Sequence, residues 1–250
     1  MFQLEELLIT SIASMLDGLR HVAVGASSPI PGAAALLARS QSRGRLQVSL
    51  LGSVRHNAFT DGGRELFDCA AKGRIDAFFL GGAQIDAEAN INLVGIGEYP
   101  KTKARFPGSF GSSYLYFLVP RVILVCLEHS NRVLVPKVDF VSAPGISPQN
   151  VYRPGGPHAL VTDRCLFSFD REACRFRLRS VHRGEDLLSI RDNTGFDFDA
   201  PAKVPETTAP SPGALALLRG EVGKEIAEVY PSFAKRVWDI SVAPEGASIS

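Results

Sequence analysis

The chain has 250 residues, of which 45% are hydrophobic and 21% charged, so it is long enough and apolar enough to bury a core of ordinary size. Its 27 basic and 26 acidic side chains leave a formal net charge of +1, which favours neither nucleic acid nor an anionic membrane as a partner. The 4 cysteines show neither a CxxC spacing nor histidine-rich surroundings, so we expect reduced, mostly buried thiols and no metal site.

The sequence shows no sign of export or of a membrane anchor. Glu5 and Glu6 stand where a signal peptide would need basic residues. The most apolar stretch, residues 114–127, is interrupted by Pro120 and Arg121 and is shorter than the ~20 apolar residues of a membrane helix. We therefore expect a soluble, cytoplasmic protein.

Hydrophobic spacing in the first 155 residues alternates between the periods of a helix and of a strand. Apolar residues recur every three or four positions in residues 4–19, which predicts an amphipathic helix. Strands are then predicted at residues 21–25, 46–51, 75–80, 91–96 and 122–127, and helices at residues 32–39, at residues 64–72 and from about residue 111. This alternation is typical of an α/β fold with a mainly parallel sheet covered on both faces.

The last third of the chain has a different texture. Short alternating runs at residues 159–162, 165–169 and 175–181 predict antiparallel strands. Helices are predicted at residues 185–191 and 213–222, with the proline-rich linker 201–212 extended between them. We expect a single domain over residues 1–250, with a core of about residues 1–155 and an antiparallel elaboration of about residues 156–250.

Three glycine-rich loops follow predicted strands, and ligands of parallel sheets collect where such strands end. The first loop, residues 25–32, has two equally good interpretations. Its backbone approaches a ligand, or it is a plain strand-to-helix turn. In the second, residues 81–86, Gln84 and Asp86 could orient a polar ligand or only satisfy the backbone of their own turn. The third, residues 107–113, could hold an oxyanion on successive backbone N–H groups or be a flexible turn.

Several motifs occur together in one order along roughly residues 20–200. They are VAVGASSPIPGAA, FFLGGAQIDAEANINLVGIGEY, KTKARFPGSFGSS, VPKVDFVSAPG, LVTD and NTGFDFD. Together they resemble the β subunits of the class I coenzyme A transferase family, in particular its glutaconate CoA-transferase branch.

The resemblance implies a Rossmann-like α/β fold and a partner α subunit, in an αβ or α2β2 assembly with the site in the cleft between subunits. The substrate would be an acyl-CoA thioester, so coenzyme A enters as part of the substrate and no cofactor is bound permanently. The backbone of residues 108–111 would face the thioester oxygen, and Gly111→Val should then impair turnover with little loss of stability. The residues implied to bind substrate or coenzyme A are Gly81, Gly82, Ala83, Gln84, Asp86, Asn90, Arg105, Gly108, Ser109, Phe110 and Gly111.

The chain departs from the family at the nucleophile. The family's transferases carry a glutamate in a Glu-Ser-Gly or Glu-Asn-Gly motif at the end of the second strand, and alignment on Gly52 puts Leu50 in its place. Leucine has no lone pair with which to attack a thioester, so a glutamyl-CoA intermediate cannot form there. The neighbouring Ser49 would point to the opposite face of the strand.

A thioester cradle without this nucleophile leaves water as the attacking group. The combination is similar to the family's hydrolases that open the last steroid rings in cholesterol catabolism. We therefore expect a hydrolase that cleaves a carbon–carbon bond of a cyclic β-keto acyl-CoA. Two alternatives stay open: a true CoA-transferase that recruits a glutamate from another loop or subunit, and a non-catalytic structural β subunit that completes the cleft of the α subunit.

The hydrolase hypothesis requires a general base, which we expect as a carboxylate on the α subunit. Within this chain His56 is a weak candidate, because a lone loop histidine is usually solvated. Arg105 pairs either with a substrate carboxylate or with a surface carboxylate of the chain itself. Glu128 and His129 follow a predicted strand and could lie near the cleft.

Overall fold

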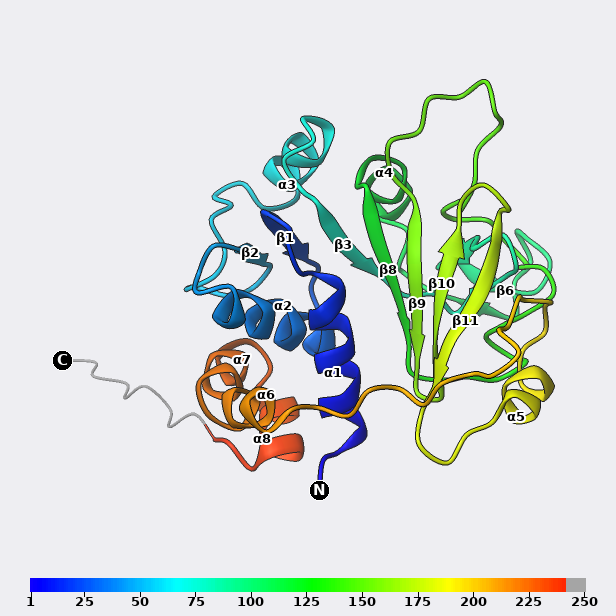
Figure 1. Cartoon of the computed structure of the whole chain (residues 1–250). Helices are drawn as coiled ribbons and strands as arrows, with labels where there is room; N and C mark the ends of the chain where they lie inside the picture. The colour runs from blue at the N-terminus through cyan, green and yellow to red at the C-terminus, as the bar shows by residue number, and fades with distance from the viewer. Residues whose placement is uncertain (242–250) are drawn as a thin grey trace.

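One seven-stranded sheet organises the computed structural model, which describes residues 1–241 (Figure 1). The strand order is β11-β10-β9-β8-β3-β1-β2. The strands are β1 (His21–Val24), β2 (Gln47–Leu50), β3 (Ala77–Leu80), β8 (Arg121–Cys126), β9 (Pro157–Thr162), β10 (Cys165–Asp170) and β11 (Arg175–Val181). The five strands from β9 to β2 in this order are mutually parallel, whereas β10 and β11 pair antiparallel.

The central strands are buried on both faces, as parallel strands covered by helices must be. Along β1, Val22 and Val24 point into one hydrophobic cluster, and Ala23 between them points into the other. The first cluster is covered by α1 (Leu4–Met15), by α2 (Pro29–Gln41) and by the C-terminal helices, the second by α3 (Gly62–Ala71) and α4 (Ser112–Leu118). The predicted fold class, a mainly parallel α/β sheet with antiparallel strands at its C-terminal end, is confirmed.

Helix α2 carries the small residues Gly32, Ala33, Ala34 and Ala35 because it is enclosed on two sides. A Cβ atom on Gly32 would lie 3.3 Å from side-chain atoms of both Leu50 and Ile226. Leu50 ends strand β2, and Ile226 lies on α7 (Gly223–Val229), so α2 separates the sheet from the C-terminal helices. Small residues allow this close approach of three layers.

Two expectations about strands are wrong. Residues 91–96 do not form one strand of the main sheet; they form β5 (Ile91–Asn92) and β6 (Gly95–Ile96), which pair with β4 (Gln84–Ile85) and β7 (Ala104–Arg105) in two small hairpins. The Asn92 side chain accepts hydrogen bonds from the backbone of Val94 and Gly95 and turns the chain between them. The second wrong expectation concerns residues 159–162, which were predicted to be antiparallel. They belong to β9, which pairs parallel to β8 and is antiparallel only to β10.

The C-terminal helices are more extensive than predicted. The expected helix at residues 213–222 is α6 (Pro212–Leu217) followed by a π-helical turn (Leu218–Val222), and α7 and α8 (Pro231–Trp238) continue it. The linker before them crosses from β11 and α5 (Leu187–Asp192) to the opposite side of the molecule, as Figure 1 shows. It is anchored on β11, where Val181 N donates to Pro205 O and Thr207 N donates to Val181 O.

The first helix ends earlier than predicted, at Met15, and Gly18 then turns the chain with a positive φ of 74°. Within residues 1–241 no helix has the length and apolar character needed to cross a membrane. All four cysteines are free thiols, and Cys126 and Cys165 are buried.

Candidate functional site

The loops that follow β1 and β3 leave the sheet toward opposite faces, because α2 covers one face and α4 the other. Such a divergence at the carboxyl ends of neighbouring parallel strands opens a crevice where ligands of this fold class bind. A cavity of about 290 Å³ lies there. We call the ends of β1, β2, β3 and β8, with the loops that follow them, the carboxyl edge.

The cavity is apolar inside and polar at its rim. Its apolar lining includes Ile30, Phe79, Leu80, Val125, Leu127 and Phe233, and Ser27, Ser28, Gly81 and Arg236 also line it. Arg236 is bound to the Glu5 carboxylate and lies over the Phe233 ring, 5.4 Å from its centroid. The cavity is therefore suited to an apolar group of moderate size with polar groups at its mouth.

Helices α7 and α8 attach the first glycine-rich loop to the rest of the fold. The backbone N–H of Ser28 donates a hydrogen bond of 3.2 Å to Tyr230 Oη, at the junction of α7 and α8. Burial raises the pKa of Tyr230, opposed in part by this bond, so the phenol stays neutral and can accept it.

Leu50 ends β2 with its side chain fully buried, toward α2 and α7. Its backbone N–H donates to His56 O at 2.7 Å, so the loop after β2 folds back onto the strand. Ser49 points the other way, as period-two alternation predicts, and lies 2.9 Å from His21 Nε2. Neither residue presents a nucleophile to solvent.

Two carboxylates of α7 approach the loop that follows β2. Glu228 accepts hydrogen bonds from Val54 N (2.7 Å) and Ser53 Oγ (3.2 Å). Glu225 Oε1 lies 3.4 Å from His56 Nε2, and the two side chains are only 15% and 10% exposed. The sequence motifs did not predict Glu225 and Glu228 as site residues. The only sequence signal for them was their spacing of three positions, which puts two glutamates on one face of a helix.

The second glycine-rich loop places its polar residues inside the β4–β5 hairpin. Asp86 accepts hydrogen bonds from the backbone of Glu88 and Asn90 and from Asn90 Nδ2, and it is 4% exposed. Gln84 Oε1 accepts from Asn92 Nδ2 and from Asp139 N. Gln84, Asp86 and Asn90 therefore hold this loop together, and their contact with a substrate stays a prediction.

The glycines of the second loop permit close approach of the chain to itself. A Cβ atom on Gly81 would lie 3.1 Å from Val125 O, and one on Gly82 would lie 2.6 Å from Ile91. Ala83 N donates to Asn92 O across the hairpin. Of this loop, Gly81 reaches the rim of the cavity at the carboxyl edge.

The third glycine-rich loop, Gly108–Gly111, packs against α3 on the face of the sheet opposite α2. The Phe110 ring is 81% exposed and lies 5.6 Å from the ring of Phe67, and Ser109 O accepts a 3.3 Å hydrogen bond from Ser112 Oγ. The expectation that Gly111→Val leaves stability intact is wrong, because Gly111 has a φ of +65° and a Cβ atom there would lie 2.3 Å from Phe67 Cζ. That substitution would disturb the loop and α3 whatever the loop binds.

The remaining charged candidates have partners of their own. Arg105 on β7 lies over the Tyr99 ring at 5.7 Å, and Glu128 pairs with Arg132. His129 is buried, with its two ring nitrogens 2.9 Å from Thr162 Oγ1 and Thr194 Oγ1. Burial lowers the pKa of His129 to about 4, so it stays neutral and serves the packing of β9 and α5.

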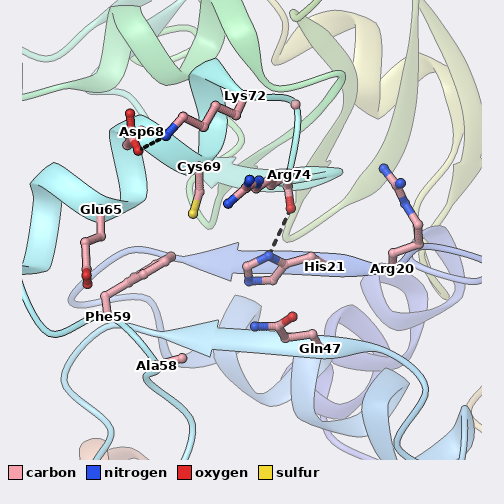
Figure 2. A pocket seen from close by; sticks show the side chains of 11 residues that line it. Arg20, His21, Gln47, Ala58, Phe59, Glu65, Asp68, Cys69, Lys72 and Arg74 are labelled. Carbon is pink, nitrogen blue, oxygen red and sulfur yellow. Dashed lines mark hydrogen bonds and ion pairs between the residues drawn. The ribbon is translucent and has the colours of Figure 1, made fainter.

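A second cavity, of about 780 Å³, lies at the other end of the strands (Figure 2). It is lined by His21 and Gln47, which begin β1 and β2, and by Arg74, which precedes β3. In Figure 2 the Cys69 thiol and the Arg74 side chain extend into it above His21. Both ring nitrogens of His21 are engaged, by Arg74 O and Ser49 Oγ, so this cavity contributes no free base. Among residues 1–241 no cluster of three or more His, Cys, Asp or Glu side chains is arranged to hold a metal.

Comparison with known proteins identifies a family and relatives to which this chain is similar. A model of the coenzyme A transferase family matches residues 9–184. The B subunit of glutaconate CoA-transferase from Acidaminococcus fermentans is 34% identical over 151 residues, which are 58% of this chain and 56% of the relative. The B subunit of 3-oxoadipate CoA-transferase from Pseudomonas knackmussii is 35% identical over 153 residues, 59% of this chain and 58% of the relative. The matched region thus spans little more than half the length of these curated relatives.

Solved structures extend the similarity of fold to almost the whole chain. Glutaconate coenzyme A-transferase from Acidaminococcus fermentans superposes with a TM-score of 0.78 at 23% identity, covering 96% of this chain and 98% of that one. IpdAB of Rhodococcus jostii RHA1 gives 0.77 at 25% identity, with 96% and 99% covered, and the decarboxylase AibA/AibB gives 0.75 at 23%, with 95% and 99% covered. The family match over most of the chain shows that this protein belongs to the coenzyme A transferase family, and within it the chain is similar to the B subunits of glutaconate CoA-transferase and 3-oxoadipate CoA-transferase.

Proposed function

We propose that this chain is the B-type (β) subunit of a heteromeric, cytoplasmic hydrolase that opens a cyclic β-keto acyl-CoA by carbon–carbon cleavage, as the breakdown of the last steroid rings of cholesterol requires. The observation that carries the proposal is Leu50. It stands where the family resemblance puts the nucleophilic glutamate, and its side chain is fully buried beneath α2. Without a carboxylate there, no acyl-enzyme can form at the end of β2, and water becomes the attacking group.

The reaction requires substrate binding, a general base and stabilisation of developing charge. Water loses a proton to a base and adds to the ring ketone, and the bond between that carbon and the α-carbon of the thioester then breaks. The electron pair of the broken bond leaves as a thioester enolate, which takes up a proton. The products are a new carboxylate and an intact CoA thioester. One well-placed oxyanion donor typically stabilises such an enolate by ~3 kcal/mol.

Different parts of the chain would bind the acyl group and the thioester of the substrate. The apolar cavity of about 290 Å³ at the carboxyl edge suits the hydrocarbon part of the acyl group. The backbone of Gly108–Gly111 would face the thioester, together with Gly81, Gly82 and Ala83, and Arg105 would meet a substrate carboxylate. Coenzyme A is part of the substrate, and no permanently bound cofactor is needed.

The active assembly contains a second, different chain. The relatives in the comparison are named as B-type chains of their enzymes, and by extension a partner α subunit completes the cleft in an αβ or α2β2 enzyme. Expressed with an α subunit of the family, the chain should elute as a stable complex, and catalysis should require both chains. An active, monodisperse chain without a partner would contradict the heteromeric assembly.

The alternative function is CoA transfer between carboxylic acids, and the names of both curated relatives favour it. It requires a glutamate recruited from another loop of this chain or from the partner. A structural subunit without catalytic groups is the remaining alternative. The two catalytic functions differ in where the new carboxylate oxygen originates.

The deciding experiment uses the assembled enzyme in ¹⁸O-labelled water with oxocyclohexanecarboxyl-CoA, whose ketone is β to the thioester. A hydrolase releases a ring-opened product that carries the label in its new carboxylate and retains its CoA thioester. Borohydride, which reduces a glutamyl thioester, should leave the mass of this chain unchanged during turnover. A reduced glutamate in this chain, or strict dependence on a second carboxylic acid, would establish the transferase instead.

A further inference from the structure

His56 and Glu225 form a buried pair in which each side chain retains an unused polar atom. His56 Nε2 and Glu225 Oε2 are both inaccessible to solvent and have no hydrogen-bond partner within residues 1–241. His56 Nε2 lies 3.4 Å from the other oxygen of Glu225, without the alignment of a hydrogen bond. Buried polar groups are nearly always bonded, so a pair left in this condition requires an explanation.

The other buried histidines show how unusual this is within the molecule. His21, His129 and His182 each have both ring nitrogens engaged by side-chain or backbone oxygens. His56 Nδ1, in contrast, makes no hydrogen bond within the described part of the chain. His56 is therefore held on one side by a carboxylate and left uncommitted on the other.

The pair lies beside the position that lost its nucleophile. His56 O accepts the hydrogen bond of Leu50 N, which fixes the histidine at the end of β2. Glu228, one turn further along α7, holds the same loop through Val54 N and Ser53 Oγ. Both glutamates lie outside residues 9–184, the part matched by the family model, so the C-terminal helices bring carboxylates to this edge.

We propose that His56, oriented by Glu225, is the general base for the hydrolysis. This inference rests on the proposed function and assigns the base to this chain rather than to the partner subunit. Nε2–H faces the Glu225 carboxylate, and Nδ1 takes a proton from water as the oxygen adds to the ring ketone. The imidazolium then returns the proton to the α-carbon of the enolate after the carbon–carbon bond breaks, so protons and electrons balance.

A histidine held by a buried carboxylate is a recurrent arrangement for this task, because the carboxylate fixes the tautomer and stabilises the imidazolium. Catalytic hydrogen bonds are often long before substrate binds and shorten in the complex. The 3.4 Å separation is consistent with this behaviour. The π-helical turn Leu218–Val222, which immediately precedes α7, is also of a kind common near functional sites.

The test compares His56→Ala, Glu225→Gln and the matched control Glu228→Gln in the assembled enzyme with oxocyclohexanecarboxyl-CoA. His56→Ala should lower kcat by about 10²–10⁴-fold, the range of a lost general base, with partial rescue by added imidazole. Glu225→Gln should lower kcat less and move the acid limb of the kcat/KM profile to lower pH, because loss of a neighbouring negative charge disfavours the imidazolium. Other charged groups at this loop are Glu228 on α7 and Arg55 in the loop itself.

The control separates catalysis from support of the loop. Glu228→Gln removes a carboxylate from the same helix face but should leave the acid limb in place. Equal shifts of the acid limb in both glutamine variants, or a normal kcat in His56→Ala, would overturn the assignment of His56. The proposed function would still stand if the unaltered enzyme released labelled product. A borohydride-reduced residue at Glu225 would show it to be a recruited nucleophile. Absence of labelled product would overturn the proposed function itself, and with it this role.

Discussion

Two regions of the molecule handle buried polar groups in opposite ways. In the small hairpins β4–β7, which carry much of the family resemblance, Asp86 and Asn92 are buried and bonded within the chain. At the carboxyl edge near β2, His56 and Glu225 are almost as buried, yet each retains an unbonded atom. The hairpins thus form a fixed frame, whereas the uncommitted groups lie beside Leu50, where the chain departs from the family.

The source of the contacts also differs. The hairpin network is centred on bonds between residues close in sequence, such as Asp86 with Asn90 and Gln84 with Asn92, and the backbone of residues 138–145 adds donors to it. The carboxyl edge is held from far along the chain, because Tyr230 accepts from Ser28 N after β1 and Glu228 of α7 accepts from Val54 N after β2. We call α7, Tyr230 and α8 the C-terminal clamp. Substitution of a buried polar residue should therefore destabilise the hairpins most. The clamp should be most sensitive to the loss of packed side chains.

The largest effect is expected at the centre of the hairpin frame. Asp86→Ala leaves the N–H groups of Glu88 and Asn90 without their acceptor in a buried setting. We expect the free energy of unfolding to fall by about 4 kcal/mol, since several buried donors and the amide of Asn90 lose a charged partner. Urea titration measures this, with Asp68→Ala, which breaks only an exposed pair with Lys72, as the near-neutral control. A loss below about 1 kcal/mol would contradict the network.

Leu50 tests the packing of the clamp against the sheet. Leu50→Ala should cost about 3 kcal/mol because a cavity opens between β2 and α2, whereas Leu50→Met should cost less than about 1.5 kcal/mol. Leu50→Glu should unfold the chain or detach α7 rather than create a transferase, since the side chain points into the core. A folded Leu50→Glu enzyme that forms a glutamyl thioester would show that residue 50 faces the cleft after all.

The sequence predicted the elements whose signals are local. The apolar runs of β1, β3 and β8 and the opposite orientations of Ser49 and Leu50 follow from strand periodicity. Residues 91–96 depart from the single strand that their pattern predicts, because side-chain bonds from Asn92 to the backbone override that pattern.

The parts that could not be predicted depend on tertiary contacts. Helices α7 and α8 are short, and their stability comes from packing, of α7 on α2 and of α8 on α7, rather than from their own propensity. The approach of Glu225 to His56 depends on the path of the linker across the molecule, which no local motif encodes. The sequence could therefore locate the candidate site by its loops, but it could not predict that His56 and Glu225 form a buried pair there.

A smaller, pH-dependent effect is expected where the clamp meets the first helix. Burial acts to raise the pKa of Glu6, but Arg219 and the backbone N–H of Gln3, with Trp238, hold it below its usual value of 4.5. Since the folded pKa is the lower one, the stabilisation is complete above about pH 4.5 and is lost as the pH falls through the folded pKa. Arg219→Ala should lower the free energy of unfolding at neutral pH, although Glu6 retains two donors, and the loss should shrink below that pH. A pH-independent difference in urea titrations would contradict the ion pair.

The smallest effect isolates the single bond between the clamp and the loop after β1. Tyr230→Phe removes the oxygen that accepts from Ser28 N and leaves the ring packed near Gly32. We expect a loss of about 1 kcal/mol in the free energy of unfolding, the usual net worth of one hydrogen bond. Hydrogen exchange at the Ser28 amide should accelerate by about fivefold, because that amide is then protected only by the packing of its loop. Tyr152→Phe, on a side chain 87% exposed, is the matched control and should change neither quantity. If Ser28 exchanged at its original rate in Tyr230→Phe, the loop at the mouth of the cavity would be ordered by its own turn, and the clamp would act only on the loop after β2.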